Sequence, residues 1–146
     1  MVRKLTVFLF NRRKRINKEY TLKLFEAFPE LYRRRRKSLN EGMMSFVFEC
    51  GDGWYDIIWH LSEDITRLAN DARVEIPQVS QVKEKFGALR FYIGFKDNSI
   101  SEPVHVLIRE AERESTKTCE VCGAVGLLRN KQNWVRTTCE KHAISE

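Results

Sequence analysis

The chain has 146 residues, of which 42% are hydrophobic and 32% charged, and its formal net charge is +6. This composition excludes a disordered chain and predicts one globular domain with at most a small appended module. No apolar run approaches the roughly 18 residues that a membrane-spanning helix needs, so no membrane insertion is expected from the sequence.

The positive charge is concentrated at the N-terminus. Residues 1–38 carry 13 Lys and Arg against 3 Asp and Glu, a net charge of +10. Residues 39–146 carry 13 against 17, a net charge of −4. We therefore expect any surface that binds a polyanion to lie in the N-terminal quarter of the chain.

The first ten residues superficially resemble a secretory signal, because two basic residues precede a short apolar run. That run has only about six residues, and the basic stretch Arg12-Arg13-Lys14-Arg15 stands where a small-residue cleavage site would follow. The segment is expected to form a buried strand or short helix in a cytoplasmic protein. In a reducing compartment, the spacing of the four cysteines indicates a metal site rather than disulfides.

A helix is expected over residues 20–37, where apolar residues recur at helical spacing and Pro29 would break or restart the helix. Dense basic clusters flank this region, and guanidinium groups suit phosphate oxygens. The arginines assigned to anion or nucleic-acid binding are Arg12, Arg13, Arg15, Arg33, Arg34, Arg35 and Arg36. The alternative is a solvated basic surface, or pairing with the acidic excess of residues 39–146.

A second helix is expected over residues 54–70, with Asp52 as its candidate N-cap. An apolar stripe at helical spacing supports it. The stripe comprises Trp54, Ile57, Ile58, Leu61, Ile65 and Leu68. Cys50, just before this region, is expected to be a small buried hydrophobe, because no His or Lys close in sequence would lower the pKa of its thiol.

In residues 73–95 apolar and polar side chains alternate with a period of two, which predicts a β-hairpin. Val74 and Ile76 would open its first strand, and the turn is expected at residues 85–87. A last helix is expected over residues 102–116, with Ser101 as its candidate cap. These elements predict an α+β fold in which two or three helices pack on a short antiparallel hairpin. The expected units are a basic N-terminal segment (1–45), an α+β core (46–116) and a zinc module (117–146).

The pattern Cys119-x2-Cys122-x16-Cys139-x2-His142 predicts one zinc ion in a ribbon-like site. Trp134 and Val135, with Leu127 and Leu128, are expected to pack the small core of this ribbon. His105 or Cys50 could replace His142 as fourth ligand only through the tertiary fold. Four protein ligands leave no open position, so the ion would stabilise the fold rather than catalyse a reaction.

Two classes of zinc enzyme are excluded by spacing. A nucleobase deaminase needs His-x-Glu and Pro-Cys-x-x-Cys, whereas His60 and Glu63 are separated by two residues and Thr118 precedes the first cysteine. A nuclease motif centred on a histidine would need one between the ligand pairs, and residues 123–138 contain none. The series Asp56, His60 and Asp64 shares one helical face and could hold a second metal or an acid–base pair, although a solvated face is far more common.

A second constellation lies in the predicted hairpin. Lys83, Lys85 and Arg90 could together grip a phosphate, while Tyr92 or Trp54 stacks a base. The alternative is an ordinary solvent face with the aromatic residues in the core.

Three motifs in order resemble a family of small uncharacterised proteins of bacteriophages and prophages. They are Cys50-Gly51-Asp52-Gly53-Trp54, then Lys83-Glu84-Lys85-Phe86-Gly87-Ala88-Leu89-Arg90-Phe91-Tyr92, then Cys119-x2-Cys122-Gly123 with Trp134-Val135-Arg136-Thr137-Thr138-Cys139. The resemblance covers roughly residues 46–143. It implies a phage-type setting in a bacterial host cell and no particular activity.

The expected function is a non-enzymatic, zinc-stabilised binding protein that contacts nucleic acid through its basic N-terminal region. One alternative is a phage inhibitor that binds an acidic host protein or defence factor. Another is a small-nucleotide binder built around Trp54, His60, Lys83, Lys85 and Arg90.

Overall fold

The chain folds into a mixed arrangement of helices and small sheets, as expected for an α+β protein. The structure, a computed structural model, describes residues 14–35, 46 and 48–143. Its longer elements are α2 (Lys18–Ala27), β1 (Phe48–Glu49), α4 (Tyr55–Ala72), β2 (Gln78–Lys85), β3 (Ala88–Gly94), α5 (Ser101–Ser115), β4 (Leu127–Lys131), β5 (Trp134–Thr138) and α6 (Glu140–Ala143). Short 3-10 turns precede α4 (Asp52–Trp54) and α5 (Asn98–Ile100).

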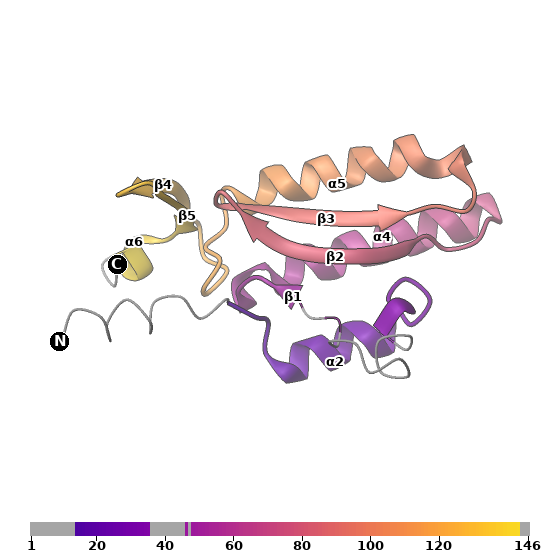
Figure 1. The fold of residues 1–146 in the computed structure, drawn as a ribbon, viewed down its shortest axis with the longest axis horizontal. Helices are drawn as coiled ribbons and strands as arrows, with labels where there is room; N and C mark the ends of the chain where they lie inside the picture. Colours follow the sequence, from indigo (N-terminus) through magenta and orange to yellow (C-terminus); the bar gives the residue numbers. More distant parts are fainter. Residues whose placement is uncertain (1–13, 36–45, 47, 144–146) are drawn as a thin grey trace.

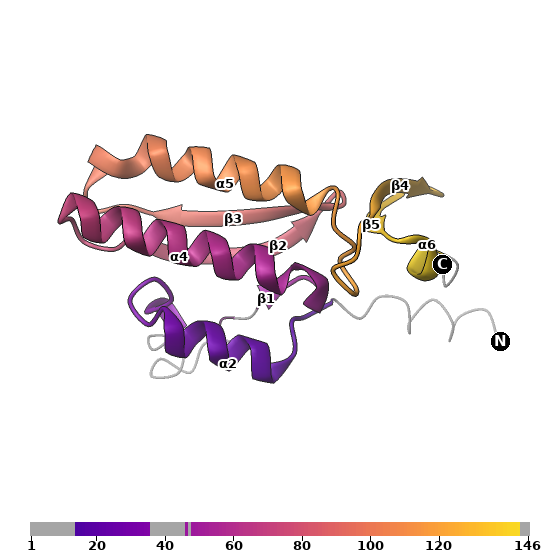
Figure 2. The same cartoon turned by 180° about the vertical axis from the view of Figure 1, so that it is seen from behind.

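A three-stranded sheet in the order β1-β2-β3 forms the centre of the molecule. β1 pairs with β2 in parallel, and β2 pairs with β3 as the predicted antiparallel hairpin. Helices α4 and α5 lie on one face of this sheet, with α2 beside α4 (Figures 1 and 2). No described helix covers the opposite face, which is turned toward the viewer in Figure 1.

The hydrophobic core lies between the sheet and the helices. The predicted apolar stripe is buried except for Leu68, which is half-buried. Val82 and Phe91 on the inward side of the hairpin and Val104 and Ile108 of α5 are buried as well. Leu24 and Phe25 of α2 belong to the same buried cluster. The described part of the basic N-terminal segment is therefore packed into the core and does not stand apart from it.

Two predicted elements have different bounds. The first helix ends at Ala27, where Phe28 caps it and Pro29 follows, and helical conformation resumes at Arg34 and Arg35, as the sequence suggested for that proline. Residues 36 and 37 lie outside the described part of the chain. The hairpin strand β2 begins at Gln78 instead of Val74, directly after Pro77. Val74 and Ile76 pack against the core outside the strand.

Neither predicted helix cap acts as one. The Asp52 carboxylate accepts a 2.7 Å hydrogen bond from the backbone N–H of Asn17, and α4 begins after Trp54 with no side-chain cap. Ser101 is the first residue of α5, which also lacks a side-chain cap. The parallel strand β1 was not predicted, since two residues are too short to show a strand periodicity.

The β4–β5 hairpin is an antiparallel pair in which Leu128 faces Thr137 and Lys131 faces Trp134. Leu127, Leu128 and Trp134 are 63%, 54% and 59% exposed. The expectation that they form a small core is therefore wrong. The hairpin is held instead through Thr137, which bonds to Glu120 in the turn after α5 and to Gly87 in the turn between β2 and β3. Among the described residues, no helix is long and apolar enough to cross a membrane.

Candidate metal centre

The four predicted ligands come from three adjacent elements. Cys119 and Cys122 lie in the turn after α5, Cys139 directly follows β5, and His142 belongs to α6. The backbone N–H of Gly123 donates to the carbonyl oxygen of Cys119 at 2.9 Å and closes this turn. Gly123 has a φ of 80°, a conformation that side-chain-bearing residues rarely adopt, which explains the glycine after the second cysteine.

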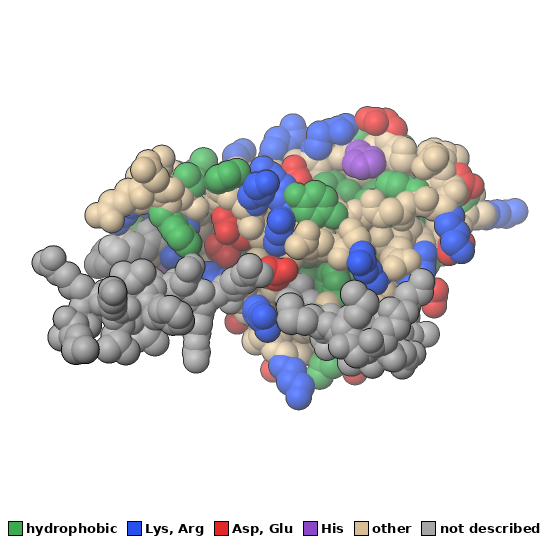
Figure 3. Space-filling model, in the orientation of Figure 1, with side chains coloured by type: hydrophobic (Ala, Val, Ile, Leu, Met, Phe, Trp, Pro, Cys, Tyr) green, Lys and Arg blue, Asp and Glu red, His purple; other side chains and the backbone are tan. Residues whose placement is uncertain are grey.

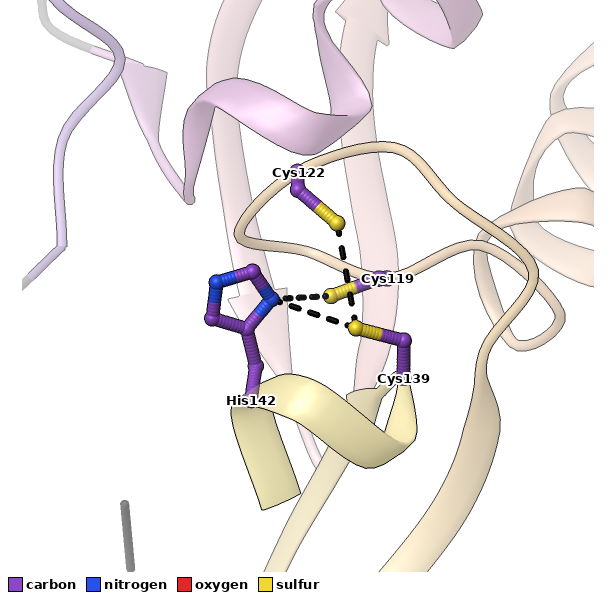
Figure 4. Close-up of side chains that lie close together, drawn as sticks. All are labelled: Cys119, Cys122, Cys139 and His142. Atoms are coloured by element: carbon purple, nitrogen blue, oxygen red, sulfur yellow. Dashed lines mark hydrogen bonds between the residues drawn. The ribbon is translucent and has the colours of Figure 1, made fainter. Parts of the chain in front are cut away.

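The ligand atoms of these residues all lie within 4.8 Å of one another. Nδ1 of His142 is 3.5 Å from the sulfur of Cys119 and 3.2 Å from that of Cys139 (Figure 4). The sulfurs of Cys122 and Cys139 are 3.8 Å apart. All four side chains point toward one common centre (Figure 4).

These separations can be compared with those around a tetrahedral zinc ion. Bond lengths of about 2.3 Å to sulfur and about 2.0–2.1 Å to nitrogen place two sulfurs about 3.8 Å apart and a sulfur and a nitrogen about 3.6 Å apart. The Cys122–Cys139 distance of 3.8 Å and the Cys119–His142 distance of 3.5 Å match this pattern, and the Cys139–His142 distance of 3.2 Å is somewhat shorter. The cluster is thus compatible with zinc both in its donor set and in its geometry.

The thiols of the cluster are electrostatically unequal. Burial raises the pKa of Cys119, but hydrogen bonds from the backbone N–H groups of Cys139, Cys122 and Val121 outweigh it and lower the pKa to about 6. At Cys122 the backbone N–H of Ala124 lowers the pKa, yet burial and the neighbouring sulfurs outweigh it and raise the pKa. Sulfurs this close repel one another as thiolates, a repulsion that a bound divalent cation removes.

The two alternative fourth ligands lie elsewhere. Nδ1 of His105 is 2.7 Å from the carbonyl oxygen of Ser101 in α5. Cys50 is completely buried in the main core, as the sequence predicted for it. His142 is therefore the histidine that completes the cluster.

The turn that carries Cys119 and Cys122 packs against the segment before α4. Gly53 donates a 2.8 Å hydrogen bond to the carbonyl oxygen of Glu120, and the carboxylate of Glu120 accepts one of 3.0 Å from the backbone N–H of Gly51. The indole Nε1 of Trp54 donates to the carbonyl oxygen of Thr118 at 2.9 Å. A Cβ at Gly53 would overlap the backbone of Cys119 and Gly123. The Gly-Asp-Gly-Trp motif is thus a docking site for the metal-binding turn.

The hairpin β4–β5 packs against the turn between β2 and β3. The hydroxyl of Thr137 donates a 2.6 Å hydrogen bond to the carbonyl oxygen of Gly87, and a Cβ on Gly87 would meet Leu128 and Val135. The motif around Gly53 and the motif around Gly87 therefore both contact residues 118–143, the metal-binding segment. This convergence was not predicted, because it joins residues 50 positions apart for Gly87 and Thr137 and 67 apart for Gly53 and Glu120.

The predicted phosphate-binding residues of the hairpin do come together. Lys83 of β2 is the direct cross-strand partner of Arg90 in β3. The Lys83 ammonium lies 5.8 Å from the centre of the Tyr92 ring, which is 41% exposed. Lys85 follows on the same face, two residues along the strand. Basic and hydrophobic side chains are interspersed over this uncovered side of the molecule (Figure 3).

Acidic residues flank the basic side chains of Lys83, Lys85 and Arg90. Glu112 of α5 lies 3.8 Å from the guanidinium of Arg90, and Glu49 of β1 is the strand partner of Lys83. Among the described residues, Lys83 and Lys85 form no ion pair.

Trp54 does not belong to this surface. Its side chain is completely buried and its indole N–H is bonded to Thr118, so the expectation that it stacks a base is wrong. The small-nucleotide site predicted around Trp54 and Arg90 loses its central residue. Asp56 and His60 are exposed on α4, and none of the series Asp56, His60 and Asp64 belongs to a metal-ligand cluster among the described residues.

The arginines of the N-terminal segment have different surroundings. Arg12, Arg13 and Arg36 lie outside the described residues. Arg33 donates to the carbonyl oxygen of Ile76 at 2.8 Å and forms a 3.2 Å ion pair with Glu75, and the guanidinium of Arg35 lies 4.7 Å from the centre of the Phe25 ring.

Arg34 also has an interaction partner. Arg15 is exposed beside Ile16, whose backbone N–H donates to Phe48 of β1, so Arg15 lies at the β1 edge of the sheet.

Comparison with known proteins adds no assignment. No family model matches the chain, and neither curated proteins nor solved structures show a significant match.

Proposed function

We propose that the chain binds one structural zinc ion through Cys119, Cys122, Cys139 and His142. The support is the Cys3His donor set, whose ligand atoms lie within 4.8 Å of one another and include separations of 3.5 and 3.8 Å, close to those of a tetrahedral zinc site. Four protein ligands fill the coordination shell, so the ion has no position for water or substrate. Its role is to hold the metal-binding turn against Gly53 and the β4–β5 hairpin against Gly87.

We further propose that the protein is a non-enzymatic nucleic-acid-binding protein. The observation that carries this proposal is the pairing of Lys83 with Arg90 beside Tyr92 on the face of the sheet that no described helix covers. Arg15 at the β1 edge extends the basic character toward the N-terminal segment, whose net charge supplies the long-range attraction. Cationic side chains bind the phosphates, while an exposed aromatic ring offers a stacking surface.

Titration of the intact protein with fluorescent oligonucleotides at several salt concentrations tests this proposal. Affinity is expected to fall linearly with the logarithm of salt concentration, and Lys83→Ala should reduce the slope by about 0.7–0.9. Glu110→Ala, an exposed change on α5, is the control and should leave the slope unchanged. Failure of the wild type to bind DNA or RNA at low salt would remove the proposal.

A second candidate is an inhibitor that binds a host protein, as the phage-type resemblance suggests. The metal-binding segment exposes the hydrophobic side chains of Val125, Leu127 and Trp134, which favours this candidate because exposed apolar groups are common at protein contacts. A stoichiometric protein complex recovered from nuclease-treated bacterial lysate, and lost on Trp134→Ser, would support it. Recovery of nucleic acid alone would count against it.

A further inference from the structure

The turn between β2 and β3 carries an aromatic residue that the fold does not require. Phe86 and Gly87 form the two-residue connection, and both have a positive φ, 53° and 77°. Such turns strongly favour Asn-Gly, because asparagine tolerates this conformation far better than a bulky side chain. The Phe86 side chain is nevertheless 69% exposed, so burial in the core does not explain its presence.

A lysine accompanies each exposed ring of this hairpin. The ammonium of Lys85 lies 5.6 Å from the centre of the Phe86 ring, as that of Lys83 lies 5.8 Å from the centre of Tyr92. Lys83 and Lys85 are two residues apart in β2 and so project from the same face of the sheet. Each of the two rings therefore has beside it a cation that projects from this face of the sheet.

The two rings are well separated along the hairpin. Tyr92 is opposite Gln81, five positions before Phe86, which corresponds to about 17 Å of extended strand. Arg90 and Lys83 lie between them. Aromatic rings alternating with cations along a flat surface are the pattern that binds successive bases and phosphates of an unpaired strand. Bases within a duplex are stacked on one another and leave no free face for such rings.

We propose that Phe86 is a second stacking residue beside Tyr92, and that the ligand of this face is single-stranded nucleic acid. The inference rests on the proposed function and narrows its ligand class. Charge complementarity favours this occupant over an apolar protein surface, because Lys83 and Lys85 form no ion pair among the described residues.

The test uses the intact, metal-loaded protein and oligothymidylate of about 20 nucleotides, together with a duplex of the same length. Phe86→Asn supplies the residue that the turn prefers, so it should not lower the thermal stability. It should weaken binding to the single strand at least about fivefold, because one stacked base is lost. The salt slope should stay unchanged, since no phosphate contact is removed.

Two further variants separate stacking from general hydrophobic contact. Phe86→Trp should keep the wild-type affinity, whereas Phe86→Leu should behave like Phe86→Asn, because leucine has no aromatic face. Val106→Gln changes another exposed hydrophobic residue, 40% exposed on α5, and should have no effect.

The outcomes distinguish this inference from the proposed function. If Phe86→Asn binds oligothymidylate as tightly as the wild type while Lys83→Ala remains impaired, Phe86 is not a stacking residue and the proposed function stands. Tighter binding of the wild type to the duplex, or equal affinities of the leucine and tryptophan variants, would also overturn the inference. A wild type that binds neither probe at low salt removes both proposals.

Discussion

The backbone N–H of Gly53 donates a 2.8 Å hydrogen bond to the carbonyl oxygen of Glu120, which stands between the first two cysteines of the metal-ligand cluster. The segment before α4 and the metal-binding turn are thereby held in contact, with Glu120 almost completely buried between them. Any change that loosens one of these segments is expected to loosen the other. This relationship makes the Cys3His cluster part of the main fold.

Replacing Gly53 with alanine should destabilise the protein. The added Cβ would overlap the carbonyl oxygen of Cys119, and such overpacking costs about 1–3 kcal/mol or more. Thermal unfolding should show a lowered midpoint, and metal release to a chelator should be faster. Gly94→Ala is the matched control, because its Cβ would approach no atom outside the neighbouring residues more closely than 3.9 Å. Equal behaviour of the two variants would show that the contact at Gly53 is not tight.

Purified protein should contain about one zinc ion per chain by elemental analysis. Removal of the metal should cost on the order of 10 kcal/mol and unfold at least residues 118–143, because this short segment has too little buried apolar surface to fold alone. Hydrogen exchange before and after chelation would measure the effect.

Cys119→Ser should lose the metal. His142→Ala should weaken metal binding less, because water can take the place of the imidazole. Metal-free native protein, or a disulfide between Cys119 and Cys122, would contradict this prediction.

Cys50 should be the slowest of the four cysteines to react. Burial raises its pKa well above the ordinary value, and the nearby Glu120 carboxylate adds to this effect. With a disulfide-exchange reagent at neutral pH, chelated protein should expose three reactive thiols, and the fourth should react only after full unfolding.

The same burial of Cys50 makes stability depend on pH. In the unfolded chain the Cys50 thiol ionises near pH 8.5, so its contribution to the unfolding free energy is lost as the pH rises above that value. Cys50→Ala should flatten the alkaline loss.

Arg33 should contribute to stability and not to nucleic-acid binding. Its guanidinium bonds to the Ile76 carbonyl and pairs with Glu75, and the arginine side chain is only 23% exposed. Arg33→Ala should therefore lower the unfolding free energy by about 1–2 kcal/mol, measured by urea denaturation. The affinity of this variant for nucleic acid, measured at a urea concentration well below its unfolding midpoint, should be unchanged. Arg15→Ala is the complementary variant and should reduce the salt dependence of binding with little effect on stability. The reverse pattern would assign Arg33 to the ligand surface.

Several features followed from the sequence by itself because their causes are local. The spacing of Cys119, Cys122, Cys139 and His142 identified the cluster, since a two-residue gap is sufficient for both members of a pair to reach one ion. The helical repeat of apolar residues located α4, and the turn at Phe86-Gly87 separated the two strands of the hairpin. Each of these signals lies within one turn, one helix or one strand.

Only the tertiary structure decided which surfaces cover one another. The apolar stripe of α4 showed that Trp54 belonged to a face, but not that Thr118 would accept its indole N–H and remove it from solvent. Likewise, the basic run did not show that Arg33 would be bonded to Ile76. The contact of Gly53 with Glu120 joins residues 67 positions apart. Periodicity tells which side of an element is apolar, whereas the partner of that side depends on long-range packing that no local pattern contains.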